Sequence, residues 1–179
     1  MRLLIALGLS LALSTPALAQ QATQKPADAP EPMCYVTDKD LPPGLEDWEG
    51  TAPITTATGA EHLAHASLTL GKGYQATLLN TPKVAMPVQP EKPGGSVAHA
   101  GLFAFTVETE GLYTVALGTA AWIDVLEDGK SLEPKSFGHG PKCTSIRKMV
   151  VFPLKPGVHT LQVSANADPL LKLMVAKQP

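Results

Sequence analysis

An alternation of apolar and polar positions with a period of two marks the middle of the chain. In Leu102–Val107 and in Leu112–Leu117, large apolar side chains occupy every second position. This period is typical of strands that are buried on one face. The short Glu108–Gly111 link between the two runs predicts an antiparallel hairpin, whose apolar face forms an inner wall of the core.

Further runs of β-type residues follow, and turns rich in Gly, Pro, Asn and Asp separate them. The run Trp122–Leu126 leads into Asp128-Gly129, which is a hairpin turn signal. Before residue 100 the pattern is weaker: Glu61–Leu70 suits a short helix or a strand, and Val84–Val88 suits an edge strand, where Pro is tolerated. Three later strands are predicted at Ile146–Leu154, Val158–Ala165 and Leu170–Ala176.

The strand spacing predicts the fold class. About eight to ten short strands, with no long helix, indicate an all-β fold: an antiparallel β-sandwich of jelly-roll type. We assign residues 33–179 to this sandwich as one domain. Residues 20–32 are rich in Pro, Ala and Gln and bury too little apolar surface to order themselves, so they are predicted to be a disordered linker.

The N-terminus predicts a secretory signal peptide over residues 1–19. Arg2 gives a short positive region, the apolar run Leu3–Leu13 is too short to span a bilayer, and residues 17–19 read Ala-Leu-Ala, a typical cleavage site. An uncleaved membrane anchor is the alternative interpretation. Cleavage after Ala19 would give a periplasmic or secreted protein with no membrane span in the remaining chain.

The charge balance bears on the partner. The formal net charge is −2 and the basic residues are nearly all Lys, which is not the basic footprint of a nucleic-acid-binding protein. We therefore expect no nucleic-acid partner, and an unknown envelope protein or a glycan instead.

The two cysteines, Cys34 and Cys143, predict one disulfide if the protein reaches an oxidising compartment. The alternative is that Cys143 is a reactive or metal-binding thiol beside His139. A disulfide would tie the start of the domain to a loop near its end.

The five histidines are the candidates for a metal site. His62 and His65 would share a face on a helix and could then share a metal. His99 and His139, with Glu61 or Asp124, could form a facial triad of the kind that holds iron. Alternatively, these are loop histidines with no common site. The residues themselves predict no cofactor, and iron or another divalent metal enters only under the metal-site alternative.

Two further positions are weak candidates for ligand binding. His139 lies between Gly138 and Gly140, whose freedom allows the backbone to approach a ligand closely, or simply to make a tight turn. The sole Arg after the signal sequence, Arg147, adjoins Lys148 on the opposite face of a strand. It suits a structural salt bridge, or less readily an anion-binding group.

The strand around Trp122 gives another candidate. If Ile123 and Val125 face the core, Trp122 and Asp124 share the outer face, where they could stack on and hydrogen-bond a sugar. Otherwise Trp122 is itself a core aromatic and Asp124 begins a turn network.

Two resemblances rest on these motifs. The order FAFTV, GLYTV and a D-G-K turn, followed by LKPGVHTLQV, resembles the jelly-roll accessory domains of bacterial pre-peptidase C-terminal type and related carbohydrate-binding modules. Phe103–Lys130 and Leu154–Val163 carry it, which is about a quarter of the chain. This resemblance implies the sandwich fold and says little about the ligand.

A closer resemblance, over most of the domain, is to short exported proteins of alphaproteobacteria, especially sphingomonad-like ones. It is carried by Pro90–Val97, Ala121–Val125, Gly138–Cys143 and Ser145–Leu154. Proteins of this group often bear the name homogentisate 1,2-dioxygenase, which would imply non-haem iron held by two His and a Glu. The chain lacks the spaced His and Glu pattern of that cupin-type enzyme.

Taken together, the sequence favours a non-catalytic binding or accessory β-sandwich protein of the periplasm or envelope. A small metal-dependent enzyme is the alternative from another class, and a carbohydrate-binding module is the third possibility.

Overall fold

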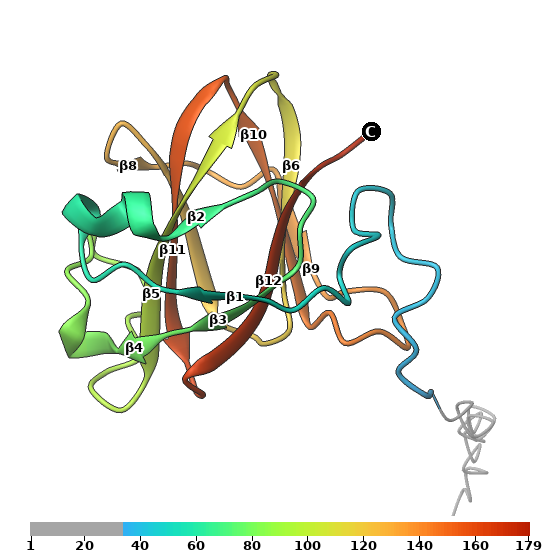
Figure 1. The fold of residues 1–179 in the computed structure, drawn as a ribbon, viewed down its shortest axis with the longest axis horizontal. Coiled ribbons are helices and arrows are strands. Elements are labelled where there is room, and N and C mark those ends of the chain that lie inside the picture. Colours follow the sequence, from blue (N-terminus) through green and yellow to red (C-terminus); the bar gives the residue numbers. More distant parts are fainter. Residues whose placement is uncertain (1–33) are drawn as a thin grey trace, which may run out of the picture. The chain divides into compact units, whose positions relative to one another are not determined.

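A computed structural model of the chain describes residues 34–179. The predicted signal peptide, residues 1–19, and the predicted linker, residues 20–32, lie outside the described residues. Within the described part, strands predominate and two mixed sheets lie face to face (Figure 1). The predicted all-β sandwich is therefore confirmed. None of the helices between Cys34 and Pro179 has the length and apolarity needed to cross a membrane.

The first sheet has the spatial order β1-β3-β12-β6-β10-β9. Its strands are β1 Ala52–Thr55, β3 Tyr74–Thr77, β6 Gly111–Leu117, β9 Ser136–Gly138, β10 Lys148–Leu154 and β12 Leu170–Lys177. The second sheet has the order β2-β5-β11-β7-β8, with β4 also paired to β5. Its strands are β2 Ser67–Leu68, β4 Leu79–Asn80, β5 His99–Val107, β7 Trp122–Glu127, β8 Lys130–Ser131 and β11 Gly157–Asn166. Two 3-10 helices, η1 Ala60–His65 and η2 Thr81–Lys83, precede β5.

The predicted hairpin between residues 102 and 117 is wrong in its pairing. Both runs are strands, but β5 pairs with β11 in the second sheet, whereas β6 pairs with β10 and β12 in the first. The link between them crosses from one sheet to the other. Because the two strands lie in different sheets, their apolar faces meet across the core and not side by side. Phe103 on β5 and Tyr113 on β6 are both buried there. The hairpin signal at Asp128-Gly129 is confirmed, since β7 pairs antiparallel with β8 there.

Two strand pairs depart from the antiparallel expectation. β1 runs parallel to β3, and β2 runs parallel to β5, so both sheets are mixed. The predicted edge strand Val84–Val88 is wrong, because no strand lies between η2 and β5. Prolines at positions 87, 90 and 93 cannot donate to a ladder. The backbone of Val88 is instead bound by the Gln162 side chain, whose Nε2 donates to the Val88 carbonyl oxygen over 2.9 Å.

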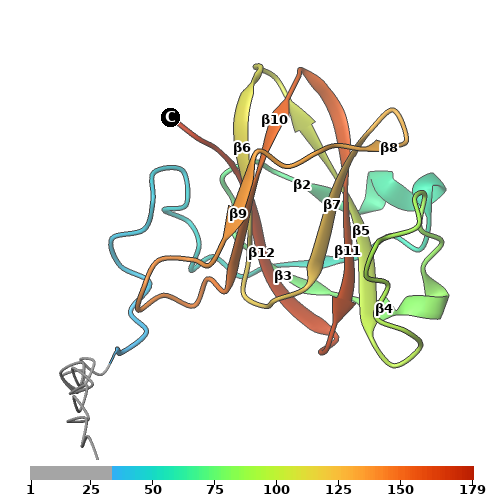
Figure 2. The ribbon, with the colours of Figure 1, turned by 180° about the vertical axis from the view of Figure 1, so that it is seen from behind.

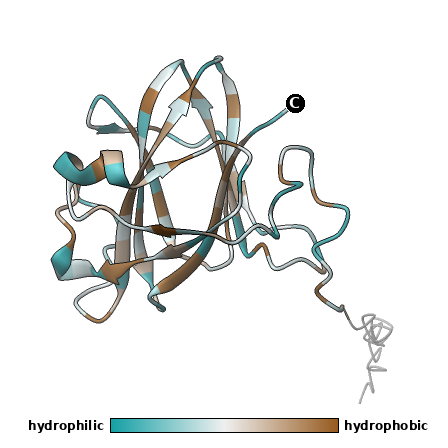
Figure 3. Ribbon diagram, in the orientation of Figure 1, coloured by the Kyte–Doolittle hydropathy of each residue, from teal (hydrophilic) through white to brown (hydrophobic). Residues whose placement is uncertain are grey.

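The main core lies between the sheets. It contains the inward side chains of β5, β6, β10, β11 and β12, and apolar positions recur along the strands of both sheets (Figure 3). A smaller cluster covers the outer face of the first sheet, where Leu45 and Trp48 pack on Ile146 and Met174. Trp48 is fully buried there, so the segment before β1 is part of the packed domain.

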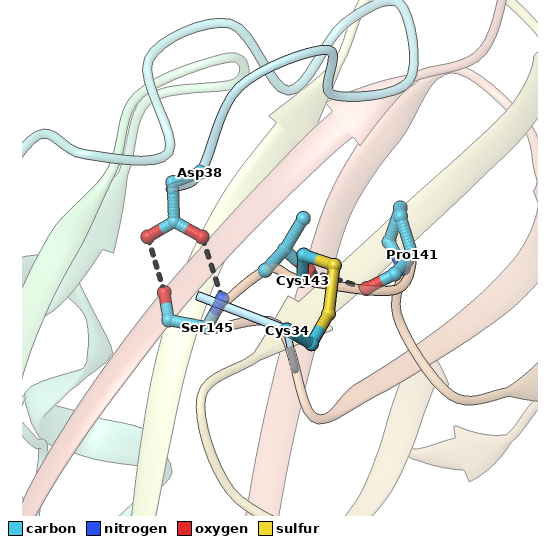
Figure 4. The surroundings of a disulfide bond; sticks show 6 residues. Cys34, Asp38, Pro141, Cys143 and Ser145 are labelled. Carbon is cyan, nitrogen blue, oxygen red and sulfur yellow. Dashed lines mark hydrogen bonds between the residues drawn. A yellow bond between two sulfur atoms is a disulfide. The ribbon is translucent and has the colours of Figure 1, made fainter. Parts of the chain in front are cut away.

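The predicted disulfide between Cys34 and Cys143 is present (Figure 4), so Cys143 offers no thiol for metal binding. Next to it, the Asp38 carboxylate accepts hydrogen bonds from the backbone N–H and the hydroxyl of Ser145. The Trp48 Nε1–H donates to the same Ser145 hydroxyl oxygen over 2.8 Å. We call residues 34–48 the N-terminal anchor, because these contacts fix that segment to the loop before β10.

Candidate ligand-binding cleft

A cleft lies at one open side of the sandwich, where β7 of the second sheet faces β10 of the first. The segment that leaves β8 passes from the second sheet to β9 in the first (Figure 2), and it forms one rim of this cleft. The space has a volume of about 580 Å³, within the range of roughly 300–1,000 Å³ that is usual for small-ligand sites. Its apolar lining includes Val88, Ile123, Leu132, Phe137, Val150 and Phe152.

Trp122 and Asp124 both line this cleft. Ile123 and Val125 are buried while Trp122 and Asp124 are half-buried, so the alternation along β7 sends this pair to the face away from the core, as the ligand-binding interpretation required. The first part of the alternative, in which Trp122 is a core aromatic, does not fit this placement. Its second part, in which Asp124 begins a turn network, agrees with the contact between Asp124 and Ser131 across the β7–β8 turn.

Asp124 holds the side chains around it in place. One of its oxygens accepts from the Trp122 indole N–H over 3.1 Å, and the other accepts from Gln162 Nε2 over 3.1 Å. The Ser131 hydroxyl lies 3.5 Å from the first oxygen. Because Gln162 also binds the backbone of Val88, Asp124 links the orientation of the indole to the segment that covers the second sheet.

Two lysines bring positive charge to the indole. Lys92 Nζ lies 5.1 Å and Lys148 Nζ 5.4 Å from the centroid of the Trp122 ring, within the range of cation–π attraction. Each lysine is positioned by a backbone contact. Lys148 Nζ donates to the Ala121 carbonyl oxygen over 2.8 Å, and the Ser164 hydroxyl donates to the Lys92 carbonyl oxygen over 2.8 Å.

The environment of Lys148 disfavours its charged form. Burial lowers the pKa of Lys148 below its usual value of 10.5, the nearby charge of Lys92 lowers it further, and the Asp124 carboxylate acts in the opposite direction. Between Cys34 and Pro179, neither lysine has a carboxylate oxygen within 4.0 Å. The cleft therefore holds two neighbouring cations that form no salt bridge within this part of the chain, although the charge of Asp124 acts on Lys148.

The histidines do not gather at the cleft or at one another. His62 and His65 are both exposed on η1, where His62 Nδ1 lies 2.8 Å from the Thr58 hydroxyl. His99 is the first residue of β5, and its Nδ1 lies 3.2 Å from the Ala167 carbonyl oxygen. Among the described residues, no three His, Cys, Asp or Glu side chains converge as a metal site would require. The facial triad, which was one alternative interpretation of the sequence, therefore has no support in this part of the chain.

The fifth histidine, His159, is buried in the core, where its ring stacks on Phe105 with centroids 5.5 Å apart. Its Nε2 lies 2.9 Å from the Lys155 carbonyl oxygen, while Nδ1 has no hydrogen-bond partner within the described residues. The strand alternation that places Leu161 and Val163 inside places His159 inside as well.

The Gly-His-Gly motif has a packing role at one of its two glycines. A Cβ on Gly140 would meet the backbone oxygen of Ile146 and lie 2.5 Å from its Cβ, whereas a Cβ on Gly138 would have open space. Gly140 thus allows a close approach to the neighbouring chain. His139 is exposed, and its Nδ1 lies 3.4 Å from the Arg147 carbonyl oxygen.

Of the predicted site residues, Trp122 and Asp124 come together, whereas His139 and Arg147 do not join them. The side chain of Arg147 is exposed, and no carboxylate of the described residues lies within 4.0 Å of it. Its neighbour Lys148 is the basic residue that reaches the cleft. The sequence could have indicated this, because Lys148 lies two residues before the buried Val150 in one strand and so faces the same side of the sheet. Lys92 and Phe137 carried no such signal, since neither lies in a regular apolar pattern.

Comparison with known proteins adds little to this description. No protein-family model matches the chain, and no curated protein matches it. A crystal structure of a beta-glucosidase from Paenibacillus barengoltzii can be superposed with a TM-score of 0.28 and 14% sequence identity. The superposition covers 69% of this chain and 13% of that chain. At that TM-score the likeness carries no argument about fold, site or activity.

Proposed function

We propose that this protein is an exported, non-catalytic binding module, and that its ligand lies in the cleft beside β7. The observation that carries the proposal is the cleft itself. An aromatic ring, two ammonium groups and a set of apolar side chains meet around about 580 Å³ of space at the edge of a rigid sandwich.

The polar groups around the cleft suit positioning better than chemistry. The Asp124 carboxylate is engaged by the Trp122 indole and by Gln162, so it orients side chains that would contact a ligand. Sites of this kind place a few oriented polar groups within an apolar wall. The sandwich strands that carry these residues hold them more rigidly than loops would.

The two tryptophans of the chain make the proposal testable by NMR. In a ¹⁵N-correlation spectrum, the indole N–H of Trp122 reports on the cleft and that of Trp48, in the N-terminal anchor, serves as an internal control. Trp122→Phe assigns the two signals. We expect ligands from a panel of neutral saccharides and small carboxylates to shift the Trp122 signal alone. A ligand that binds Trp122→Ala with unchanged affinity would place the binding function elsewhere.

The export proposal rests on the disulfide and on the signal-like sequence before residue 20. Disulfides persist in oxidising compartments and are rare in the cytosol. Mass analysis of protein from a periplasmic extract should give a chain that begins at Gln20 with no free thiol. A chain that retains Met1, or two free thiols, would contradict the proposal.

A further inference from the structure

We propose that the cleft beside β7 selects an amphiphilic organic anion, whose anionic group lies at Lys92 and Lys148 and whose apolar body lies along the walls of the cleft. This inference rests on the proposed binding function and names the chemical class of its ligand.

The positive charge beside the Trp122 ring carries the first step. Lys92 and Lys148 both direct their ammonium groups to the ring of Trp122, and like charges placed so close repel each other. The charge of Asp124 partly offsets this repulsion at Lys148, but its oxygens accept from Trp122 and Gln162 and, within residues 34–179, it forms no ion pair with either lysine within 4.0 Å. An anion that lay between the two ammonium groups would relieve their repulsion, and it would offer each a charge-assisted hydrogen bond.

Two carboxylates at the rim of the cleft restrict the kind of anion that suits it. Glu91 and Glu133 also line the cleft. Both are exposed, as Lys92 is, whereas Lys148 is half-buried, so water screens the charges of the two glutamates more than the charge of Lys148. Selection therefore depends on the local geometry at Trp122 and not on the net charge of the lining. A small anionic group carried on a neutral body meets this requirement.

The walls decide the nature of that body. The apolar lining includes Leu132, Val150 and Phe152, together with the largely exposed ring of Phe137. Such a surface gains from contact with hydrocarbon and not from contact with hydroxyl groups. The two ammonium groups also occupy at least one face of the Trp122 ring, which leaves less of it free for the stacking of a neutral sugar.

A matched pair of probes tests the inference: octanoate and its neutral amide, octanamide. Both are titrated into the purified protein, and the Trp122 indole N–H signal and calorimetry report their binding. We expect octanoate to bind about tenfold or more tightly than octanamide, because only the carboxylate can accept charge-assisted hydrogen bonds from both lysines. We also expect high salt to weaken octanoate binding more than octanamide binding.

Variants of the lysines provide the second arm. Lys148→Met and Lys92→Met keep most of the side-chain volume and remove the charge, and each should weaken octanoate binding about tenfold while leaving octanamide within about threefold. Lys172→Met is the matched control, because Lys172 Nζ lies 5.0 Å from the ring of Trp48, in the same kind of contact but in the N-terminal anchor. A dispersed spectrum confirms that each variant is folded.

The outcomes separate the ligand class from the binding function. If octanoate and octanamide bind equally, or if both lysine variants bind octanoate as the wild type does, the inference is overturned while the cleft remains a binding site. If a neutral saccharide shifts the Trp122 signal and octanoate does not, the inference is overturned in favour of a sugar ligand. If no member of either panel shifts that signal, the proposed function falls as well.

Discussion

Replacing Asp38 by Ala should destabilise the domain, because this carboxylate is the centre of the N-terminal anchor. The Asp38 side chain is only 9% exposed and accepts two hydrogen bonds from Ser145. Hydrogen bonds to a charged group contribute about 1.5–3 kcal/mol each, and their loss leaves the Ser145 N–H without its partner. Since the two bonds share one acceptor and water can replace part of the interaction, we expect a loss of about 2–3 kcal/mol from these contacts.

The backbone at Asp38 requires a matched control. Its φ is +45°, a conformation in which Asp is tolerated better than Ala, so Asp38→Ala also strains the chain. Asp40 has a φ of +53° and an exposed side chain, so Asp40→Ala carries the same kind of strain without the anchor contacts. The difference between the two variants in the free energy of unfolding gives the contribution of the Asp38 contacts, which are the hydrogen bonds with Ser145 and an ion pair with Lys172 at 3.9 Å.

Urea denaturation of the oxidised protein, followed by Trp fluorescence and by circular dichroism, measures this difference. A loss of this size would lower the Tm by on the order of 5–10 °C in a domain of this length. Ser145→Ala combined with Asp38→Ala should cost less than the sum of the two single changes, because both remove the same bond. If Asp38→Ala and Asp40→Ala differ by less than about 0.5 kcal/mol, the anchor does not stabilise the fold and the reasoning fails.

Three other perturbations have defined outcomes. Replacing Cys34 and Cys143 by Ser opens a link between residues 109 apart, and the chain-entropy model gives a loss of about 4–5 kcal/mol in urea denaturation; a loss below about 1 kcal/mol would contradict this use of the model. Gly140→Ala should cost about 1–3 kcal/mol because its Cβ meets Ile146, whereas Gly138→Ala should be nearly neutral, and equal losses would refute the packing role. The folded state lowers the pKa of Lys148 below 10.5. The free-energy cost of holding Lys148 charged in the folded state is therefore full below that lowered pKa, and it fades as the pH rises toward 10.5. The stability of the wild type relative to Lys148→Met should rise over this pH window, and a flat or falling difference would refute the expectation.

The sequence predicts the strands of this fold better than it predicts their partners. The period of two in β5 and β6 identifies which side chains face the core, and Phe103 and Tyr113 are buried as expected. The same period cannot distinguish a hairpin from a crossing between sheets, because either arrangement buries the same faces. The turn at Asp128-Gly129 was predictable since its backbone conformation, with φ of 49° and 73°, is one that Asp and Gly favour.

The site was predictable only where a strand carried it. Trp122 and Asp124 alternate with buried residues, so their shared face follows from the sequence. Lys92 comes from an irregular segment whose path is set by Ser164 on a distant strand, and no local pattern encodes such a contact. The Gly-His-Gly motif suggested a ligand-facing His139 for a related reason. Gly140 is needed for its close contact with Ile146, and the sequence pattern does not reveal that contact.

The edges of the two sheets have a consequence for how copies of the protein meet at high concentration. Within residues 34–179, the strands at the ends of the two sheets are β1, β9, β2 and β8, with β4 beside β5 as a further edge strand, and none of the five is longer than four residues. Edge strands expose unpaired backbone groups that another chain can extend into a shared sheet, and short edges limit this templating. The domain can therefore keep an apolar cleft open beside β8 and β9 without offering a long ladder for self-association through β-addition.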